Sequence, residues 1–347
     1  MKKININSSV IGEDYPCFIV AEAGINHNGD LDIAKRMIRA AKECGADAIK
    51  FQTFKAEEFV GDPTLKYTYK SQGREVTESM LEMFKRCEFQ RDDWTLIKKS
   101  CDEEDIMFLS TPQNLSDLEL LLELGISAIK VGSDDFTNIP LLKSYAKTGL
   151  PMIVSAGMAD SSEIHQVLEE IGATKGYPAV LMLCTSQYPT PPEDVNLFRL
   201  ATLANTFPAV VLGYSDHTQG VLASSLAVML GASVLEKHFT LNHDLAGPDH
   251  WFSEDPEGLK EWVSSIRKAY IMKGSAVLRP TAQELLNKKN FQRVIVAAKD
   301  IRKGQVFSMD NLVMRRMGGK KGLTPGRLYS LLDRETKRTY KKGEIID

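Results

Sequence analysis

The chain has 347 residues, of which 43% are hydrophobic and 26% are charged, and its formal net charge at pH 7 is −3. This length exceeds one typical domain, so we expect one large domain and one small domain. The nearly balanced charge gives no reason to expect a nucleic-acid or membrane partner.

The sequence also predicts the cellular compartment of the protein. The first residues, MKKIN, do not open a signal peptide, and no apolar run approaches the ~20 residues that would span a bilayer. We expect a cytoplasmic protein whose cysteines are reduced thiols without a CxxC pair: Cys17, Cys44, Cys87, Cys101 and Cys184.

Short β-rich runs, each followed by an amphipathic helical pattern, alternate along most of the chain. There are eight: Phe18–Ala21, Ala48–Phe51, Met107–Ser110, Ala128–Val131, Met152–Ser155, Val180–Cys184, Val210–Tyr214 and Val234–His238. Eight strand–helix units predict an α/β fold closed as a (β/α)₈ TIM barrel. The alternative is an open doubly wound sheet, but no G-x-G-x-x-G turn follows the first run.

Two segments interrupt this alternation. Residues 55–91 form a long connection with room for an active-site loop or an extra helix. After Lys273, a Pro-containing stretch leads into brief strands between Lys-Gly turns, namely Arg293–Ala298, Val306–Phe307, Leu312–Arg315 and Thr336–Tyr340. We therefore predict a barrel over 1–275, a linker over 276–290 and a small β-rich domain over 291–347.

All eight predicted strands end in polar residues, at the edge where barrel enzymes carry their active sites. Cations and hydroxyl groups suited to a phosphate and a carboxylate are prominent there: Lys50, Lys130, Ser133, Ser155, Ser186 and Ser215. His217 and His238, on neighbouring strand ends, can share one divalent cation and leave positions open for water and substrate. Carboxylates nearby, Glu22, Asp135 and Asp249, can orient a water, move a proton or hold sugar hydroxyls.

The motifs at these ends also resemble a known family. The runs EAGINHNG, KFQTFKAE, STP, KVGS, SAGM, CTSQYPTP, GYSDHT and EKHFTL…GPDH are similar to the sialic acid synthase (N-acetylneuraminate synthase) family. The run VAAKDIRKGQVFSMDNL is similar to that family's C-terminal antifreeze-like SAF domain, which has a β-clip fold. The resemblance covers nearly the whole chain.

The resemblance implies a transferase that condenses phosphoenolpyruvate with an N-acetylmannosamine-type aldehyde to give a sialic acid and phosphate through C–O cleavage. His217 and His238 would bind Mn²⁺ or Mg²⁺, which activates the aldehyde, and Glu22 would act beside them as a catalytic residue. Residues that would hold phosphoenolpyruvate are Lys50, Thr111, Lys130, Ser133, Ser155, Ser186 and Ser215. Residues that would hold the N-acylated hexosamine are Gln52, Asp135, Tyr188, Asp249 and Arg316. A domain-swapped homodimer would bring Arg316 to the partner's barrel.

Two departures from the family pattern leave the exact sugar open. Gly132-Ser133-Asp134-Asp135 stands where many members read GSGE, and the loop 316–322 replaces the common R-P-G-x-G. A legionaminate, a pseudaminate, a deaminated nonulosonate or a 9-phosphate product is an alternative to N-acetylneuraminate. Other classes are a Schiff-base aldolase using Lys130 or Lys50, and a non-catalytic carbohydrate-binding paralogue.

Overall fold

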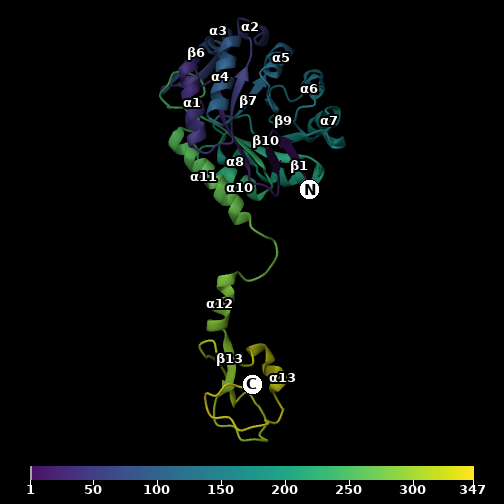
Figure 1. Cartoon of the computed structure of the whole chain (residues 1–347), viewed down its shortest axis with the longest axis vertical. Coiled ribbons are helices and arrows are strands. Elements are labelled where there is room, and N and C mark those ends of the chain that lie inside the picture. The colour runs from purple at the N-terminus through teal and green to yellow at the C-terminus, as the bar shows by residue number, and fades with distance from the viewer. Residues whose placement is uncertain (1) are drawn as a thin grey trace. The chain divides into compact units, whose positions relative to one another are not determined.

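The computed structural model describes residues 2–347 and divides into two compact units after Gly274. The first unit carries the strand–helix alternation, and the second carries the small β-rich region (Figure 1). The two units are described separately below.

The first unit is built on eight parallel strands, which confirms the predicted barrel. Their order in the sheet is β7-β4-β3-β12-β11-β10-β9-β8, and the end strands β7 and β8 contact each other. Figure 1 shows helices packed around these strands. The strands are β3 (Phe18–Gly24), β4 (Ala48–Thr53), β7 (Met107–Pro112), β8 (Ile129–Val131), β9 (Met152–Ser155), β10 (Ala179–Cys184), β11 (Val211–Asp216) and β12 (Val234–His238).

The helices bury one apolar face against the outside of the strands. In α1 (Leu31–Glu43), Ala34, Met37, Ile38 and Ala41 are buried at i, i+3, i+4 and i+7, and Asp30 caps the first turn. The other helices that follow strands are α4 (Arg91–Glu103), α5 (Leu115–Glu123), α6 (Ile139–Ala146), α7 (Ser161–Glu170), α8 (Pro192–Val195), α9 (Phe198–Thr206), α10 (Leu222–Met229) and α11 (Pro256–Lys273), with a 3₁₀ turn η1 (Ala173–Lys175).

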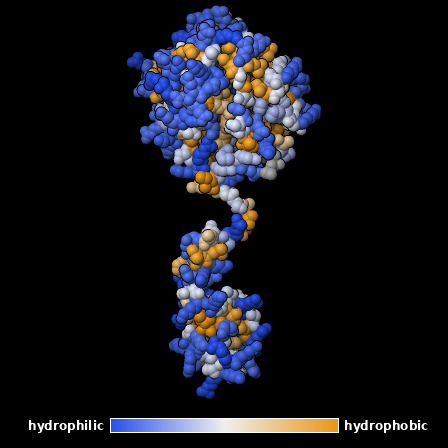
Figure 2. Space-filling model, viewed as in Figure 1, coloured by the Kyte–Doolittle hydropathy of each residue, from blue (hydrophilic) through white to orange (hydrophobic). Residues whose placement is uncertain are grey.

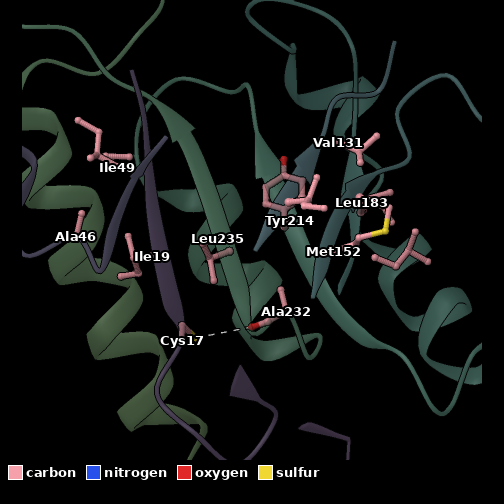
Figure 3. Close-up of a cluster of buried hydrophobic side chains, with 14 of the residues drawn as sticks. Cys17, Ile19, Ala46, Ile49, Val131, Met152, Leu183, Tyr214, Ala232 and Leu235 are labelled. Carbon is pink, nitrogen blue, oxygen red and sulfur yellow. Dashed lines mark hydrogen bonds between the residues drawn. The ribbon is translucent and has the colours of Figure 1, made fainter. Parts of the chain in front are cut away.

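The main core lies between the strands and these helices. Outward-facing strand residues such as Ile19, Ile49 and Leu235 belong to it (Figure 3). The Cys17 thiol donates to the Ala232 carbonyl at 3.7 Å, and all five cysteines are buried free thiols, as predicted. Since side chains alternate along a strand, the residues between these core positions face the barrel interior.

A short hairpin at the N-terminus was not predicted. It pairs β1 (Lys3–Ile6) with β2 (Ser9–Gly12), and Ile4, Ile6 and Ile11 pack with the inward-facing residues Phe18, Val20, Ala48, Leu109, Ala128, Ile153, Val180, Met182, Val211 and Val234. Most of these residues stand at or near the starts of their strands. The hairpin therefore covers the end of the barrel opposite the strand ends.

The long 55–91 connection holds an antiparallel hairpin between two helices, α2 (Ala56–Phe59) and α3 (Met80–Cys87). The hairpin pairs β5 (Lys66–Ser71) with β6 (Arg74–Ser79). Its two-residue turn needs left-handed backbone at both positions, with φ of 49° at Gln72 and 75° at Gly73. An extra helix in this segment is confirmed, and the hairpin is additional.

The second unit is small and has its own core. Strands β13 (Arg293–Ala297) and β14 (Leu312–Arg316) pair antiparallel, and a 3₁₀ turn η2 (Pro325–Arg327) and α13 (Leu328–Leu331) follow. Its buried residues include Ile295, Phe307, Leu312, Tyr340 and Ile346. The predicted strands at 306–307 and 336–340 are wrong as strands, because only isolated bridges form there, Val306↔Glu335 and Ile301↔Tyr340.

The segment before β13 contains a helix, α12 (Ala282–Phe291), capped by Thr281, within the region predicted as a linker. None of its residues is buried. Elsewhere the visible surface of both units is mainly hydrophilic, with scattered hydrophobic residues (Figure 2). Within residues 2–347, no helix is both long and apolar enough to cross a membrane.

Candidate active site

A cavity of about 440 Å³ lies at the C-terminal ends of the barrel strands. Predicted site residues that line it are Glu22, Lys50, Gln52, Thr111, Lys130, Ser133, Ser155, Ser186, Tyr188, Ser215, His217, His238 and Asp249. Residues far apart in the sequence meet here because parallel strands end at the same edge of the barrel.

Two predicted site residues do not line the cavity. The Asp135 carboxylate accepts a hydrogen bond from Asn138 Nδ2 at 2.9 Å, at the start of α6, while its neighbour Asp134 lines the cavity. Arg316 ends β14 in the second unit and is exposed. Its guanidinium lies 5.8 Å from the centre of the Phe291 ring.

Two ammonium groups and two carboxylates are buried together at the bottom of the cavity. Lys50 Nζ lies 2.7 Å from Glu22 Oε2 and 3.9 Å from Glu236 Oε1, and Lys130 Nζ lies 3.4 Å from Glu236 Oε1. Lys50 and Lys130 are each only 3% exposed. Isolated charges at this depth would be costly, and each of the four groups here lies beside a group of opposite charge.

These pairs shift the acid–base properties of the site. Burial acts to lower the pKa of Lys50, but the Glu22 and Glu236 carboxylates outweigh it, so the pKa is raised. Burial raises the pKa of Glu22 despite the adjacent Lys50. Burial, together with the Glu22 carboxylate, raises the pKa of Asp249 to about 7. By contrast, Lys130 and Lys50 outweigh burial and lower the pKa of Glu236. The cavity therefore holds two carboxyl groups, Glu22 and Asp249, that keep protons more readily than usual and one, Glu236, that loses its proton more readily.

Serine hydroxyls line the wall beside Lys130. Lys130 Nζ donates to Ser155 Oγ at 2.8 Å, and the Gly157 amide donates to Ser133 Oγ at 3.0 Å. A Cβ at Gly157 would lie 2.4 Å from Ser186 Oγ, so only glycine fits between these serines. Ser186 Oγ and Glu236 Oε2 are buried without a hydrogen-bond partner among residues 2–347. Unpaired buried polar atoms are uncommon, and here they indicate a place for a ligand.

The residues present fit a divalent cation at His217 and His238. Their ring centroids are 5.4 Å apart. His217 Nδ1 donates to the Thr185 carbonyl at 2.7 Å, which leaves Nε2 as a lone-pair donor. His238 Nδ1 is buried without a hydrogen-bond partner among the described residues, and burial lowers the pKa of this imidazole, which favours the neutral form that binds metals.

The pair does not form a complete protein cage. In the described part of the chain, no three His, Cys, Asp or Glu side chains are arranged to hold a metal ion. An ion at His217 and His238 would take its remaining ligands from water or substrate. Such an open coordination sphere is typical of a catalytic rather than a structural metal site.

A second buried charge network lies on the opposite face of the same two strands. Lys237 Nζ lies 3.3 Å from Asp216 Oδ2 and 3.7 Å from Glu254 Oε1, and it also donates to the Thr218 carbonyl. Asp216 accepts further bonds from the Thr218 amide at 2.9 Å and from Ser224 Oγ at 2.6 Å. This outer network comprises Asp216, Thr218, Ser224, Lys237 and Glu254, and it holds the chain on both sides of His217 and before His238.

Glu236 was not among the residues predicted for the site. The residue belongs to the EKH run, two positions before His238, and a period of two places both side chains on the same face of β12. That spacing is the signal that could have identified it. Cys184 was likewise not assigned, although it lines the cavity, with its Sγ 3.9 Å from His217 Nδ1.

Comparison with known proteins identifies the family. The NeuB family model matches residues 37–277, and the SAF domain model matches residues 292–347. The chain belongs to the NeuB family. Its C-terminal unit contains a SAF domain, as the sequence predicted.

Several relatives of this NeuB family member are named as synthases of nonulosonic acids. It is 40% identical to N,N'-diacetyllegionaminic acid synthase of Legionella pneumophila, over 92% of this chain and 90% of the relative. It is 36% identical to human N-acetylneuraminate-9-phosphate synthase, over 97% of this chain and 93% of the relative.

A solved structure supports the same assignment. N-acetylneuraminic acid synthetase from Leptospira borgpetersenii, crystallised with citrate, superposes with a TM-score of 0.74 at 33% identity. The match covers 84% of this chain and 97% of that one. Sequence family and fold therefore agree on a sialic acid synthase type of protein.

Proposed function

We propose that this protein condenses phosphoenolpyruvate with the open-chain aldehyde of an N-acylated hexosamine, giving a nonulosonic acid and phosphate. The observation that carries the proposal is the serine-lined hollow with two buried ammonium groups, Lys50 and Lys130, beside the imidazoles of His217 and His238. The names of the Legionella and human relatives, both nonulosonic acid synthases, support it.

Phosphoenolpyruvate needs donors for both a phosphate and a carboxylate. In the proposal these donors are the ammonium groups of Lys50 and Lys130 and the hydroxyls of Thr111, Ser133, Ser155, Ser186 and Ser215. Donors fixed in a buried cavity stabilise developing charge without reorganising, which is commonly a large part of catalysis. The unpaired Ser186 hydroxyl gains its partner when the anion binds.

The reaction then joins two carbons and removes phosphate. Carbon 3 of phosphoenolpyruvate attacks the aldehyde carbon, which forms the new C–C bond and leaves an oxocarbenium at carbon 2. The aldehyde oxygen takes up a proton and becomes a hydroxyl group. Water adds at carbon 2 and gives up one proton, which forms a tetrahedral intermediate. This intermediate collapses to a ketone as the bond between carbon 2 and the phosphate oxygen breaks, and its hydroxyl proton passes to the leaving phosphate. In the proposal Glu22, which contacts Lys50 Nζ at 2.7 Å and Gln52 Nε2 at 3.2 Å, orients this water and accepts its proton.

A divalent ion would complete this site. His217 and His238 would hold Mn²⁺ or Mg²⁺, and the ion would supply Lewis acidity to the aldehyde oxygen. The protein's own part is to keep His217 oriented through the Thr185 carbonyl and to leave only 12% of the His238 side chain exposed.

The sugar would lie above the imidazoles. Tyr188 packs on His217, with ring centroids 4.2 Å apart, and Gln52, Asp249 and Asp134 also face the cavity. These groups offer hydrogen bonds to the hydroxyls of an open-chain hexosamine. The homodimer in which Arg316 reaches the partner's sugar stays a prediction, and analytical ultracentrifugation of the full chain tests it.

The possible products all belong to one class, the nonulosonic acids. N-acetylneuraminate, a legionaminate, a pseudaminate, a deaminated nonulosonate and a 9-phosphate all follow from the same steps with different sugars. They differ in the end of the sugar that lies farthest from the aldehyde or in its N-acyl groups, and not in the groups around phosphoenolpyruvate.

The experiment is to incubate the protein with Mn²⁺, phosphoenolpyruvate and a panel of acylated, non-acylated and 6-phosphorylated hexosamines. Phosphate release and a 3-deoxy-2-ulosonic acid product are followed together. We expect turnover with an N-acylated sugar and its loss on addition of EDTA or in His217→Ala. No turnover with any sugar, or a His217→Ala variant as active as the wild type, contradicts the proposal. Borohydride trapping of substrate on Lys130 or Lys50 would favour the aldolase alternative instead.

A further inference from the structure

A loop leaves the barrel at the end of β12 and returns to it before α11. We name residues 239–254 the strap. Its two ends close on each other, because the Glu254 amide donates to the His238 carbonyl at 2.8 Å and the Thr240 amide donates to the Glu254 carbonyl at 2.9 Å. Three residues of the strap line the cavity, namely Pro248, Asp249 and Phe252.

The NHN run that follows β3 holds the base of the strap. Asn26 is buried, and its Nδ2 donates to the Phe239 carbonyl at 2.9 Å and to Ser253 Oγ at 2.9 Å. Ser253 Oγ in turn donates to the Asp249 carbonyl at 2.6 Å. Asn26 therefore joins the first and the last part of the strap, and it reaches the backbone of Asp249 through a single hydroxyl group.

The second asparagine of the run, Asn28, contacts the middle of the strap. Its Nδ2 donates to the Ala246 carbonyl at 2.8 Å, and its Oδ1 accepts from His250 Nε2 at 3.4 Å. Because an amide oxygen only accepts, this bond leaves His250 Nδ1 to accept from the Thr240 hydroxyl at 2.7 Å. The imidazole that follows Asp249 in the chain is thus held from both sides.

The backbone of the strap packs directly against these groups. Gly247 has a φ of 151°, and a Cβ at this position would lie 2.7 Å from His250 Cδ2 and 3.0 Å from Asn28 Oδ1. Only glycine allows so close an approach. The Gly247 amide also donates to Ser71 Oγ of the β5–β6 hairpin at 3.2 Å. The strap is therefore held between the NHN run and the hairpin.

The strap places a carboxylate beside one of the two imidazoles of the site. Asp249 Oδ2 lies 3.8 Å from His238 Nδ1. A Cβ at Gly24 would lie 3.8 Å from the same oxygen and 3.4 Å from Glu22 Oε1, so the two carboxylates border one point of the cavity. A shift of the strap by about 1 Å would move Asp249 out of this arrangement, and a misplacement of that size can slow a reaction substantially.

The inference rests on the proposed function, in which Asp249 faces the sugar. We propose that Asn26 and Asn28 are positioning residues, which hold the strap so that Asp249 stands beside His238 where the sugar binds. Neither asparagine lines the cavity. None of the residues proposed for phosphoenolpyruvate belongs to the strap, so the effect concerns the sugar.

The main variant for the test is Asn28→Gly. Asn28 has a φ of 53°, and glycine keeps this left-handed backbone while it removes the side chain. The matched control is Asn7→Gly, because Asn7 is an exposed asparagine with a φ of 51° in the turn between β1 and β2. Asn26→Ala is a second variant, and thermal melting checks that each protein folds.

Three quantities are measured: hydrogen exchange of the strap amides in the ligand-free protein, the KM for the preferred sugar, and phosphoenolpyruvate affinity by calorimetry with Mn²⁺. In Asn28→Gly the strap amides should exchange about tenfold faster, and the KM for the sugar should rise about tenfold. Phosphoenolpyruvate affinity should not change. Asn26→Ala should shift the first two quantities in the same direction, and Asn7→Gly should match the wild type in all three.

A double variant tests whether Asn28 acts through Asp249. Asp249→Ala removes the carboxylate that the strap positions, so adding Asn28→Gly to it should raise the KM for the sugar by less than about twofold. A full tenfold increase in that background would show that Asn28 acts elsewhere.

Unchanged exchange of the strap amides, an unchanged KM for the sugar, or an equal loss of phosphoenolpyruvate affinity in Asn28→Gly also overturns the inference. Failure of the proposed function is distinguishable, because the wild type would then turn over no sugar. The exchange rates need no turnover and would still test whether Asn28 holds the strap.

Discussion

The inner and outer faces of β11 and β12 both carry buried charged side chains, but they differ in how fully these side chains are hydrogen-bonded within the protein. On the inner face, Glu236 Oε2 and the nearby Ser186 Oγ have no hydrogen-bond partner among the described residues, and the cavity lies in front of them. On the outer face, both oxygens of Asp216 are hydrogen-bonded, and Lys237 has Asp216, Glu254 and the Thr218 carbonyl as partners. The outer network is therefore fully hydrogen-bonded within the protein, whereas the inner face keeps two buried polar atoms without a partner among the described residues.

The difference between the two faces matters because successive residues of the same segments contribute alternately to the inner and the outer face. His217 stands between Asp216 and Thr218 of the outer network, and His238 follows Lys237 directly. A fully bonded outer face fixes the backbone, and the backbone then fixes where the inner side chains point. Rigid support beneath an incompletely bonded site is what a preorganised catalyst requires.

The largest expected effect is on the outer face. Lys237→Met leaves the buried Asp216 carboxylate without its ammonium partner, so the free energy of unfolding should fall by about 3 kcal/mol. Chemical denaturation measures this loss. The control is Lys99→Met, because Lys99 is exposed and lies 3.6 Å from Glu103, and its loss should stay below ~1 kcal/mol. Equal losses of unfolding free energy in the two variants would mean that Lys237 in the outer network stabilises the protein no more than an exposed lysine does.

A matched pair of serines sharpens the comparison. Ser224→Ala removes the 2.6 Å bond to Asp216 and should lower the free energy of unfolding by ~1–2 kcal/mol, with little change in phosphoenolpyruvate binding. Ser186→Ala removes a hydroxyl without a described partner, so stability should change by less than ~0.5 kcal/mol while phosphoenolpyruvate binds about tenfold more weakly. Denaturation and calorimetry on both proteins decide. If Ser224→Ala and Ser186→Ala change stability and phosphoenolpyruvate binding by the same amounts, the outer face is not structural and the inner face is not a binding site.

The smallest expected effect concerns the two neighbouring aspartates. Asp134 lines the cavity, so Asp134→Ala should raise the KM for the sugar about fivefold, the loss of one hydrogen bond of ~1 kcal/mol. Asp135→Ala removes the bond to Asn138 at the start of α6 and should leave that KM unchanged. Steady-state kinetics with the preferred sugar measures both. A larger increase in this KM for Asp135→Ala than for Asp134→Ala would indicate that Asp135, the residue predicted from sequence, contacts the sugar.

The barrel and most of the cavity wall could be predicted because they follow from local patterns. Each strand is an apolar run with a polar end, and closing eight of them brings the ends together whatever the helices between them contain. Lys50, Lys130, His217 and His238 could be placed in this way, since each stands at the end of such a run.

Other features depend on contacts that no local pattern records. Asp134 and Asp135 are adjacent in a loop, but Asp134 lines the cavity while Asp135 accepts a bond from Asn138. The β5–β6 hairpin is rich in charged and polar residues, and its stability comes from pairing and from its bonds to the loop at 244–247. The predicted strand at 336–340 makes isolated bridges only, because the second unit packs irregular chain around a small core.

Phosphoenolpyruvate binding tests the central claim, that the inner face is an anion site completed by its ligand, most directly. In the presence of Mn²⁺, calorimetric titration should show one phosphoenolpyruvate per wild-type chain. Lys130→Met, checked for folding by thermal melting, should bind at least about tenfold more weakly, because a charge-assisted hydrogen bond contributes ~1.5–3 kcal/mol. No binding to the wild type, or equal affinity in the two proteins, would contradict the account.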